Sequence, residues 1–503
     1  MQYHAPARLR VEHLWFLTIL GLCAGIGALF PIDQVDFWWH LALGRAIAQT
    51  GSVPTTSSQS WVLPPATPFI YGSWLAEWLF FQLYQRGGLP LLVLTRNLLL
   101  LALLALVGLE ARRRGAGWRL AALAVAGAGL TLLNNVSVRP QICAWLPFAL
   151  TLLLLGAARQ GQLPPRALLA LPLLLVVWVN VHGTFVLGLA LVGLTAAGAS
   201  LTYLLHRDHE QRARLTWLWA ITAACAAAML INPRVADIAL FVRNLVFHPA
   251  AQGGGEWQRT DLLSYPGFLL PLALLLIAIG WYRRPERFDL TDALILAVFT
   301  WFGWSAIRSL IWFAIVAWPI AAGALAPPAR PARQRIEIPA LNYAILGLLL
   351  LVWTLTQPPL KPLLPLPPAL AGLGARVPDG WLIGANTPVQ AVAWLKQHPL
   401  PPDARLFNDL TYGSYLIWAA PEIKIAADGR LELYPLEHWI TYAAIMRDEQ
   451  ALARLDQLGA THAMLSRERS PELVARLQSP ASGWRELYRD ETTAIFARSE
   501  AAR

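Results

Sequence analysis

Residues 89–119, LPLLVLTRNLLLLALLALVGLEARRRGAGWR, combine a long apolar run with a cluster of arginines. The run 89–110 has about the 20 residues that an α-helix needs to cross the hydrocarbon core of a bilayer. Arginines directly after such a run are typical of the cytoplasmic end of a membrane helix. This stretch therefore predicts a spanning helix whose C-terminal end faces the cytoplasm.

The overall composition also indicates a membrane protein. Of the 503 residues, 56% are hydrophobic and 14% are charged, whereas soluble proteins carry roughly 25% charged residues. The 23 tryptophans suit the boundary between membrane and water, where Trp is enriched. The formal net charge of +10 could indicate a nucleic-acid partner, but the arginines stand in short clusters between apolar runs. Such clusters indicate membrane topology, so we expect no nucleic acid among the partners.

Similar runs recur along the chain and predict about 11 membrane helices. They cover 13–32, 89–110, 120–138, 141–158, 167–181, 184–205, 215–231, 266–282, 290–307, 310–326 and 340–357. Every second segment outside the membrane carries two to four arginines, namely 1–12, 111–119, 159–166, 206–214, 283–289 and 327–339. Because Lys and Arg accumulate on the cytoplasmic side, we expect the N-terminus in the cytoplasm. With an odd number of helices, the C-terminus then lies outside the inner (plasma) membrane.

These patterns predict a mainly α-helical protein, a polytopic transmembrane bundle with a C-terminal extracytoplasmic α/β domain. The bundle occupies 1–357 and includes a first extracytoplasmic loop over 33–88. A Pro-rich linker, 358–377, is expected to be extended, and the α/β domain follows over 378–503. In that domain NTPVQAVAWLKQH predicts a helix, whereas ARLFND, IKIAADGR, HAMLS and AIFAR predict short strands between turn residues.

Two aspartates lie where the first helix leaves the membrane. The stretch PIDQVDFWWH (31–40) places Asp33 and Asp36 beside two tryptophans and His40. A carboxylate that points into a protein cavity near the membrane needs a functional reason. The alternative is that both acids simply end a helix between Trp anchors. We take Asp36 and Asp33 as the candidate catalytic acids.

Other polar side chains on the extracytoplasmic side could meet them in one cavity. Glu77 lies in WLAEWLFFQLY, which predicts an amphipathic helix at the interface, and Glu256 follows three glycines. Arginines bind phosphate oxygens through a bidentate fork, although each could also extend to the membrane surface. His182, in NVHG, is either a polar site residue or a helix cap. The candidate substrate- and phosphate-binding residues are His40, Glu77, Arg139, His182, Glu256, Arg259 and Arg308.

The sequence leaves open the role of Arg96 and Asn97 and the presence of a metal. Arg96 and Asn97 lie inside the run 89–110, where an arginine either marks a functional site or reaches the surface. A divalent metal could be shared by Asp33, Asp36 and Glu256, but no specific metal-ligand spacing is present in the sequence. No other cofactor is expected.

The order of several short motifs resembles a bacterial branch of the GT-C superfamily of glycosyltransferases, with mannosyl- and aminoarabinose-transferase-like members. The motifs are DQVDFWWHLALGRAIAQTG, WLAEWLF, RPQ, WVNVHG, NP and GEW, followed in the tail by NDLTYGSYLIW and KIAADGRLELY. Each motif is weak alone, but their order along a multi-helix chain is more specific. The resemblance covers residues 13 to 440.

The resemblance implies a polytopic enzyme that takes a sugar from a polyprenyl-phosphate donor. The sugar is attached outside the membrane to a lipid, glycan or protein acceptor. The catalytic acid of this family follows the first helix, a position matched by Asp36 with Asp33 as the near alternative. The aminoarabinose-transferase-like relatives have an Asp-Glu pair there, whereas Phe37 follows Asp36 in this chain.

Two other functions fit a polytopic protein. A transporter or flippase for lipid or polysaccharide is one alternative, but neither a repeat of helices nor clear broken-helix signals are seen in the sequence. A non-catalytic membrane scaffold, whose outer domain binds a partner, is the other.

Overall fold

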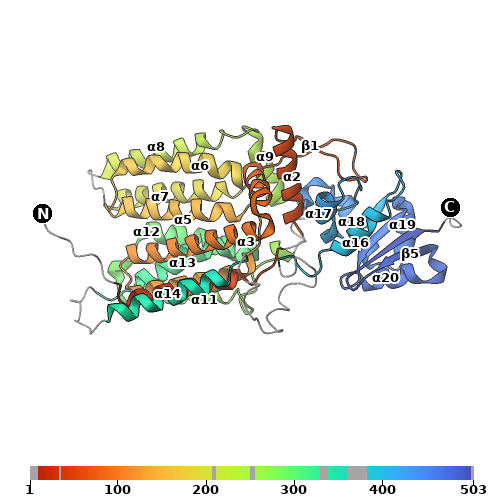
Figure 1. The fold of residues 1–503 in the computed structure, drawn as a ribbon. Helices are drawn as coiled ribbons and strands as arrows, with labels where there is room; N and C mark the ends of the chain where they lie inside the picture. The colour runs from red at the N-terminus through yellow and green to blue at the C-terminus, as the bar shows by residue number, and fades with distance from the viewer. Residues whose placement is uncertain are drawn as a thin grey trace.

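The computed structural model describes residues 9–32, 35–206, 211–249, 255–328, 338–358 and 382–499. A bundle of long helices lies beside a smaller C-terminal α/β region at one end of the bundle (Figure 1). Asp33 and nearly all of the predicted linker 358–377 lie outside the described residues.

Each of the eleven predicted apolar runs coincides with a helix of the bundle. The helices are α1 (Val11–Gly27), α3 (Trp74–Arg113), α4 (Trp118–Leu132), α5 (Ile142–Arg159), α6 (Ala170–Val181), α7 (Phe185–His206), α8 (Gln211–Ala228), α11 (Leu269–Arg283), α12 (Leu290–Ser305), α13 (Leu310–Ala324) and α14 (Pro339–Leu355). Within the described ranges, four helices are long and apolar enough to cross a membrane, and six apolar segments are shorter. The mainly α-helical fold is therefore confirmed.

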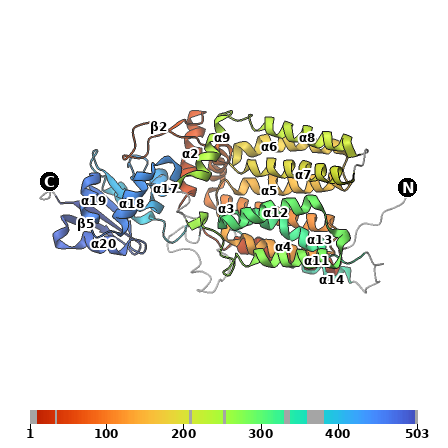
Figure 2. The same cartoon turned by 180° about the vertical axis from the view of Figure 1, so that it is seen from behind.

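Helix α13 forms the centre of the bundle. All of its residues from Leu310 to Ala324 are buried, as expected for a helix that is apolar on every side. It packs against α3, α4, α11 and α12, and Figure 2 shows α4, α11 and α13 from the other side. Trp312 and Phe148 of α5 meet at a ring distance of 5.0 Å inside this core.

The long helix α3 consists of two parts. Gly87 and Gly88 have non-helical backbone angles, and Gly88 has a φ of 60°, which favours glycine. The part before this break contains Glu77, and the part after it is the predicted spanning run. The interfacial helix and the spanning helix expected from the sequence thus meet at this break.

Helices α2 (Phe37–Thr50) and α9 (Asp237–Phe247) were not predicted. Helix α2 packs along the first part of α3, where a Cβ at Gly44 would come closer than 3.0 Å to the backbone of Glu77. A short hairpin, β1 (Thr56–Ser57) and β2 (Thr67–Pro68), completes the first loop. The described part of this first loop, 35–88, therefore contains a helix, a short hairpin and the first part of α3.

The C-terminal region contains a four-stranded sheet with the order β3-β4-β6-β5. Strands β3 (Leu406–Asn408), β4 (His462–Ser466) and β6 (Thr493–Arg498) match ARLFND, HAMLS and AIFAR, and β5 (Trp484–Arg489) was missed. Strands β3 and β4 are parallel, whereas β4–β6 and β6–β5 are antiparallel. The helices of this region are α16 (Val389–Gln397), α17 (Leu410–Ala419), α18 (Leu436–Arg447), α19 (Ala451–Leu458) and α20 (Pro471–Gln478).

The prediction of a strand for IKIAADGR was wrong. Only Ile425 forms isolated bridges, to Ser60 and Leu406. The segment runs between the first loop and the sheet, and then turns at Asp428-Gly429. Three consecutive residues, Ile425, Ala426 and Ala427, are inaccessible to solvent, but the segment forms no regular ladder.

The C-terminal region is joined to the bundle through the first loop and α2. The backbone N–H of Trp39 donates to Ser414 Oγ at 2.9 Å. The guanidinium of Arg45 lies 4.3 Å from the ring of Trp418, a cation–π distance. Ile32, at the end of the α1 segment, pairs with Ile383. These contacts place the tail directly over the point where the chain leaves the bundle.

Arg96 does not reach the surface but is fully buried at the end of α1. Its side chain donates to the carbonyl oxygens of Gly27 at 2.7 Å and Phe30 at 3.0 Å. These carbonyls lie at the C-terminal end of α1, where backbone oxygens lack helical partners and a cation is favourable. Asn97 continues the network to Gln357 beyond α14 at 2.9 Å. The pair therefore joins α1, α3 and the end of α14.

We predict that Arg96→Gln lowers the unfolding temperature of the detergent-purified protein. The shorter amide cannot reach both carbonyls, and each buried polar group left without a partner costs about 1–3 kcal/mol. Thermal unfolding monitored by intrinsic fluorescence measures the effect. Arg86→Gln is the matched control, because Arg86 is exposed on the same helix and bonds only to Gln82 among the described residues. Equal unfolding temperatures for the two variants would contradict the prediction.

Candidate functional site

A cavity of about 450 Å³ lies where the C-terminal region meets the bundle. Its wall combines the start of α2, the first part of α3, the segment before α5, the end of α6, two short 3₁₀ turns and the 429–432 segment. Seven of the candidate site residues line it: Asp36, His40, Glu77, Arg139, His182, Glu256 and Arg308. Side chains that are up to 272 positions apart in sequence thus share one chamber, as the hypothesis of a common cavity requires.

Arg139 connects two of the acids in this cavity. Its Nη1 donates to Glu256 Oε1 at 2.6 Å, and its Nε lies 3.5 Å from Asp36 Oδ2. The Asp36 side chain is 22% exposed, so it is accessible from the cavity. Burial alone would raise the pKa of Glu256, but the charges of Arg139 and Arg308 outweigh this effect and lower it. Glu256 is therefore ionised at neutral pH.

Arg308 brings a second guanidinium to the same place. It lies in the 3₁₀ turn Ile307–Ser309 between α12 and α13, and its guanidinium carbon is 4.4 Å from the ring centre of Trp257. Trp257 directly follows Glu256 in another 3₁₀ turn, Gly255–Trp257. Two arginines and two acids are therefore concentrated at one side of the cavity.

His40 and Glu77 form a buried pair on another side. His40 Nδ1 lies 2.7 Å from Glu77 Oε1, and the Glu77 side chain is 1% exposed. Burial lowers the pKa of His40, and the positive charges of Arg139 and Arg430 lower it further. The neutral imidazole can therefore donate its Nδ1–H to Glu77 and present Nε2 as an acceptor. This orientation follows from α2 packing against the first part of α3.

His182 ends α6 and faces the cavity. Its Nδ1 lies 2.9 Å from Thr184 Oγ1. Burial, followed by the charge of Arg308, lowers the pKa of His182 to about 3. The imidazole is therefore neutral at physiological pH and suits hydrogen bonding better than proton abstraction.

The turn Asp428-Gly429-Arg430 closes the cavity from the tail. Arg430 donates from Nε and Nη2 to the two oxygens of Asp428 at 2.8 and 2.7 Å, and both side chains are almost fully buried. Arg430 Nη1 also donates to Tyr71 and Ser57 of the first loop at 3.2 and 3.1 Å. A Cβ at Gly429 would collide with Asp36 Oδ1. The turn therefore passes directly over the candidate catalytic acid, and a larger residue at 429 would displace either the turn or the Asp36 carboxylate.

Glu432 lines the cavity and was missed from the sequence. It follows the turn in the short 3₁₀ helix Leu431–Leu433. Burial raises the pKa of Glu432 to about 7, and the negative charges of Asp36 and Asp428 act in the same direction. No local pattern separates Glu432 from an ordinary surface acid, although it lies within the motif KIAADGRLELY.

Two of the predicted site residues are not brought into this cavity by the described structure. Arg259 does not line it, and its guanidinium lies 5.3 Å from the ring of Trp304. Asp33 lies outside the described residues.

The described residues do not test a divalent metal shared by Asp33, Asp36 and Glu256, because Asp33 lies outside them. No group of three His, Cys, Asp or Glu residues suited to a metal is found among them. Arg139 instead lies between Asp36 and Glu256 and supplies the positive charge that a shared ion would bring.

A second cavity of about 480 Å³ adjoins the first one. Trp39, Tyr71 and Arg430 belong to both walls. The second cavity continues between α2, the 54–59 segment and the end of α17, with Arg45 and Lys424 in its wall. It therefore provides a separate approach to the same central residues.

The fold is similar to that of the oligosaccharyltransferase of Archaeoglobus fulgidus. A crystal structure of that enzyme tethered to an acceptor peptide gives a TM-score of 0.54 at 12% identity, covering 97% of this chain and 74% of that chain. Its complex with Zn and sulfate gives 0.56 at 12% identity, over 97% and 73%. ArnT from Cupriavidus metallidurans bound to undecaprenyl phosphate gives 0.46 at 15% identity, over 97% and 96%. No protein-family model and no curated protein matches the sequence.

This likeness shows that the chain shares the overall fold of that oligosaccharyltransferase, a helical bundle with a C-terminal α/β region. Together with the apolar helices, it identifies the chain as a multi-pass membrane protein.

We predict that Gly429→Ala lowers the unfolding temperature, because its Cβ would displace either the turn or the Asp36 carboxylate. Gly255→Ala is the control: Gly255 lines the same cavity, but an added Cβ would meet nothing within 4 Å. Differential scanning fluorimetry of the two purified variants tests the difference. If Gly429→Ala unfolds at the wild-type temperature, the close approach of the turn to Asp36 is refuted.

Glu432 predicts a pH dependence of stability. Its pKa rises from 4.5 to about 7 in the folded protein, so between these values the folded state retains a proton that the unfolded state has lost. The Glu432 contribution to the free energy of unfolding therefore falls as pH rises through this window. Glu432→Gln should become more stable relative to wild type between pH 5 and about pH 8.

Thermal unfolding at several pH values measures the Glu432 effect. Glu437→Gln, at an exposed position of α18, is the control. A constant difference between Glu432→Gln and wild type at every pH would show that Glu432 has an ordinary pKa.

Proposed function

We propose that this protein is an integral membrane glycosyltransferase that moves a sugar from a polyprenyl-phosphate donor to an acceptor. One observation supports this proposal above all: Asp36 and the arginines Arg139 and Arg308 line one cavity at the end of a GT-C-like bundle. A carboxylate beside two guanidinium groups suits a reaction that removes a proton from a hydroxyl and releases a phosphate.

In the proposed reaction, Asp36 is the general base. The acceptor hydroxyl oxygen forms a bond to the anomeric carbon of the sugar, and the hydroxyl proton passes to the Asp36 carboxylate. The bond between the anomeric carbon and the phosphate oxygen breaks, and its electron pair leaves with the polyprenyl phosphate. General-base assistance of this kind is typically worth about 10²–10⁴-fold in rate.

Arg139 and Arg308 stabilise the departing phosphate. A guanidinium matches phosphate oxygens through two parallel hydrogen bonds. Arg139 is paired with Glu256 and Asp36 in the absence of substrate, so its guanidinium is held near the base before the donor arrives. Fixed positive charges in a partly enclosed cavity stabilise developing negative charge without reorganisation at the moment of reaction.

The remaining cavity residues position the sugar. His40 offers Nε2, since its Nδ1 is engaged by Glu77, and His182 is neutral. Trp39 and Tyr71 provide aromatic surfaces at the boundary between the two cavities. We assign the donor to the cavity with Asp36 and the acceptor to the adjoining cavity, whose wall includes Arg45 and Lys424. The acceptor belongs to the class of lipids, glycans or proteins that carry a free hydroxyl.

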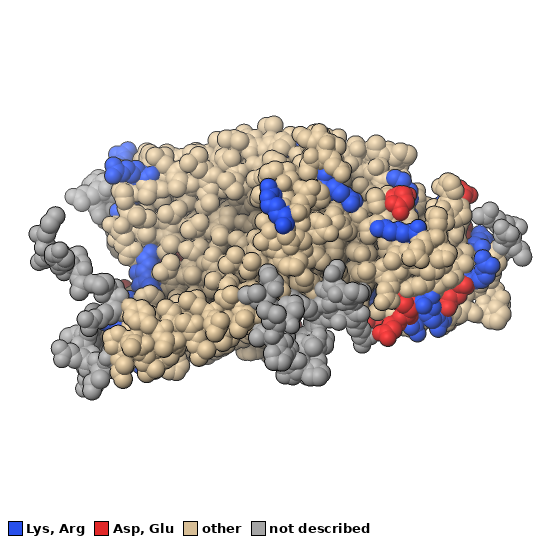
Figure 3. Space-filling view, viewed as in Figure 1, with Lys and Arg blue, Asp and Glu red and all other residues tan. Residues whose placement is uncertain are grey.

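We place the reaction on the extracytoplasmic side of the inner membrane. The arginine-rich connections 111–119, 159–166 and 283–289 come together at the end of the bundle away from the cavity, where ion pairs join them. By the positive-inside rule this end is cytoplasmic. On the face drawn in Figure 3, the middle of the bundle is largely free of charge, as a membrane belt requires.

Asp36→Asn is expected to abolish transfer while the protein still folds. The amide has nearly the same shape but does not accept the proton of an attacking hydroxyl. The assay follows release of polyprenyl phosphate from a radiolabelled sugar donor in membranes, at equal protein levels and unfolding temperatures. We expect at least a 100-fold loss of rate.

Asp237→Asn is the matched control for this variant. Asp237 begins α9, is exposed and does not line the cavity. The variant should retain wild-type transfer. Wild-type rates for Asp36→Asn would remove Asp36 as the base, and uptake of substrate without a covalent product would favour a transporter.

A further inference from the structure

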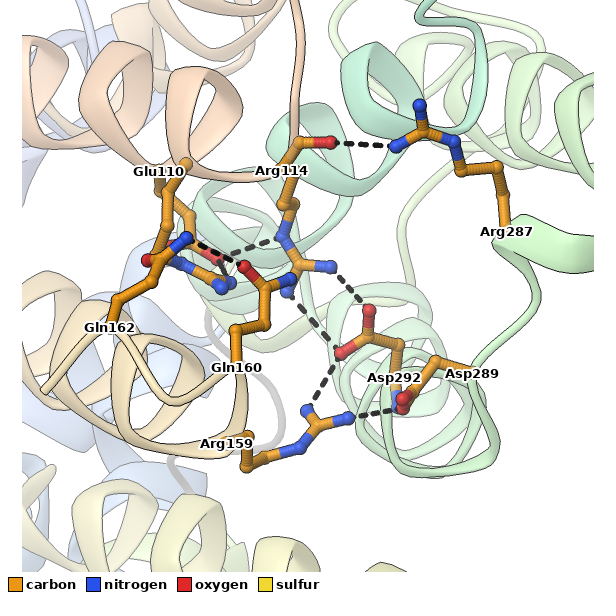
Figure 4. A network of polar contacts seen from close by, with 9 residues as sticks. Glu110, Arg114, Arg159, Gln160, Gln162, Arg287, Asp289 and Asp292 are labelled. Carbon is orange, nitrogen blue, oxygen red and sulfur yellow. Dashed lines mark hydrogen bonds and ion pairs between the residues drawn. The ribbon is translucent and has the colours of Figure 1, made fainter. Parts of the chain in front are cut away.

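A third cavity, lined by several arginines, lies at the opposite end of the bundle from Asp36. It has a volume of about 420 Å³ and is formed by the ends of α3, α5 and α13, the start of α12, parts of α7 and α8, and the 286–289 connection. Five arginines line it: Arg113, Arg114, Arg159, Arg214 and Arg287. Figure 4 shows Arg114, Arg159 and Arg287 approaching from three different segments.

Three of these arginines are paired with carboxylates. Arg113 pairs with Glu110 through two hydrogen bonds. Arg114 pairs with Glu110 at 2.7 Å and with Asp292. Arg159 pairs with Asp292 at 3.0 Å and with Asp289 (Figure 4). These ion pairs connect α3, α5 and α12 and explain why the pocket is ordered.

The pocket still has guanidinium donors that these acids do not satisfy. The Arg113 side chain is only 7% exposed, and its Nη1 has no hydrogen-bond partner among the described residues. Arg287 donates to the carbonyl oxygen of Arg114 at 3.2 Å and, within the described ranges, pairs with no carboxylate. Arg214 on α8 also pairs with no carboxylate among the described residues. Glu286 also lines the pocket but forms no ion pair in the described part of the chain.

We propose that this pocket binds a phosphate group, carried by an anionic phospholipid of the cytoplasmic leaflet. Buried guanidinium donors without partners are costly, and phosphate oxygens satisfy them in the bidentate geometry that Arg favours. Apolar side chains lie beside the arginines, among them Leu218, Trp281, Phe288 and Ile320. This combination suits a headgroup phosphate with its glycerol and the start of its acyl chains.

The position of the pocket in the membrane favours a lipid as the source of the phosphate. The arginine-rich connections mark this end as cytoplasmic, where anionic lipids accumulate and basic pockets between helices bind their headgroups. A free phosphate has the same recognition chemistry, so the experiment separates the two sources. The inference concerns a site far from Asp36 and does not depend on the transfer reaction.

Arg214 and Arg212 provide a matched pair of variants. Both are exposed arginines on α8, two positions apart, but only Arg214 lines the pocket. Removal of either charge changes the net charge equally. Neither residue has an ion pair among the described residues, so both variants should fold. Arg113→Gln is less informative because it also breaks the pair with Glu110.

The experiment measures phospholipid binding to the full-length protein purified in a neutral detergent. Phosphatidylglycerol, phosphatidylcholine and inorganic phosphate are titrated separately, and bound lipid is counted by native mass spectrometry together with the unfolding temperature. We expect wild type and Arg212→Gln to bind one phosphatidylglycerol with equal affinity and to be stabilised by it. Arg214→Gln should bind it at least 5-fold more weakly.

The pattern of ligand binding across the three proteins decides whether the pocket binds a phospholipid. Stabilisation by phosphatidylglycerol but not phosphatidylcholine, lost selectively in Arg214→Gln, supports a lipid site. Stabilisation by inorganic phosphate alone, with the same dependence on Arg214, supports the phosphate chemistry but assigns it to a soluble ligand and overturns the lipid assignment. Equal binding by Arg214→Gln and Arg212→Gln, or no binding to any of the three proteins, overturns the proposal.

Discussion

The buried ion pair between Asp428 and Arg430 determines how the C-terminal region sits on the membrane bundle. Removing two charges from water is costly unless geometry and additional hydrogen bonds compensate. Here the bidentate pair is completed by Tyr434, which donates to Asp428 at 2.9 Å, and by the contacts of Arg430 with Tyr71 and Ser57. Because the partners come from both the tail and the first loop, the pair satisfies its hydrogen bonds only when the two regions are docked.

Docking in turn defines the cavity. The same turn carries Gly429, which passes over Asp36, and leads into Glu432. Without the tail, the cavity would lose the part of its wall formed by the 429–432 segment and would be lined by the bundle and the first loop alone. The candidate base would then face open water, where arginine and carboxylate charges interact weakly. The tail is therefore a part of the site and not a separate appendage.

The bundle was predictable from the sequence because a bilayer imposes a length on each apolar run. The run 89–110 and the arginines after it, for example, correspond to the second part of α3 and its end at Arg113. Helix α2 was missed because its tryptophans were interpreted as membrane anchors, although Gly51 at a φ of 68° provides a normal helix end. IKIAADGR was misread because Ile423, Lys424 and Ile425 alternate as in a strand, whereas Ile425, Ala426 and Ala427 are all buried and only Ile425 forms bridges within this segment.

The residues of the candidate site could be predicted only in part from the sequence. Asp36, Glu77 and Glu256 could be singled out because few acids occur in the predicted extracytoplasmic segments between the apolar runs. Glu432 and the approach of Gly429 to Asp36 depend on how distant segments pack, which no local pattern encodes. Arg259 shows the opposite limit, since an arginine near a helix end has an alternative partner in Trp304.

The break at Gly87-Gly88 has a consequence for how this chain tolerates change. In an unbroken helix, inserting one residue rotates everything beyond it by about 100°. Here Gly87 and Gly88 have non-helical backbone angles between the half of α3 that holds Glu77 and the half that ends at Arg113. A change of helical phase in one half can therefore be absorbed at these two glycines and need not turn the side chains of the other half.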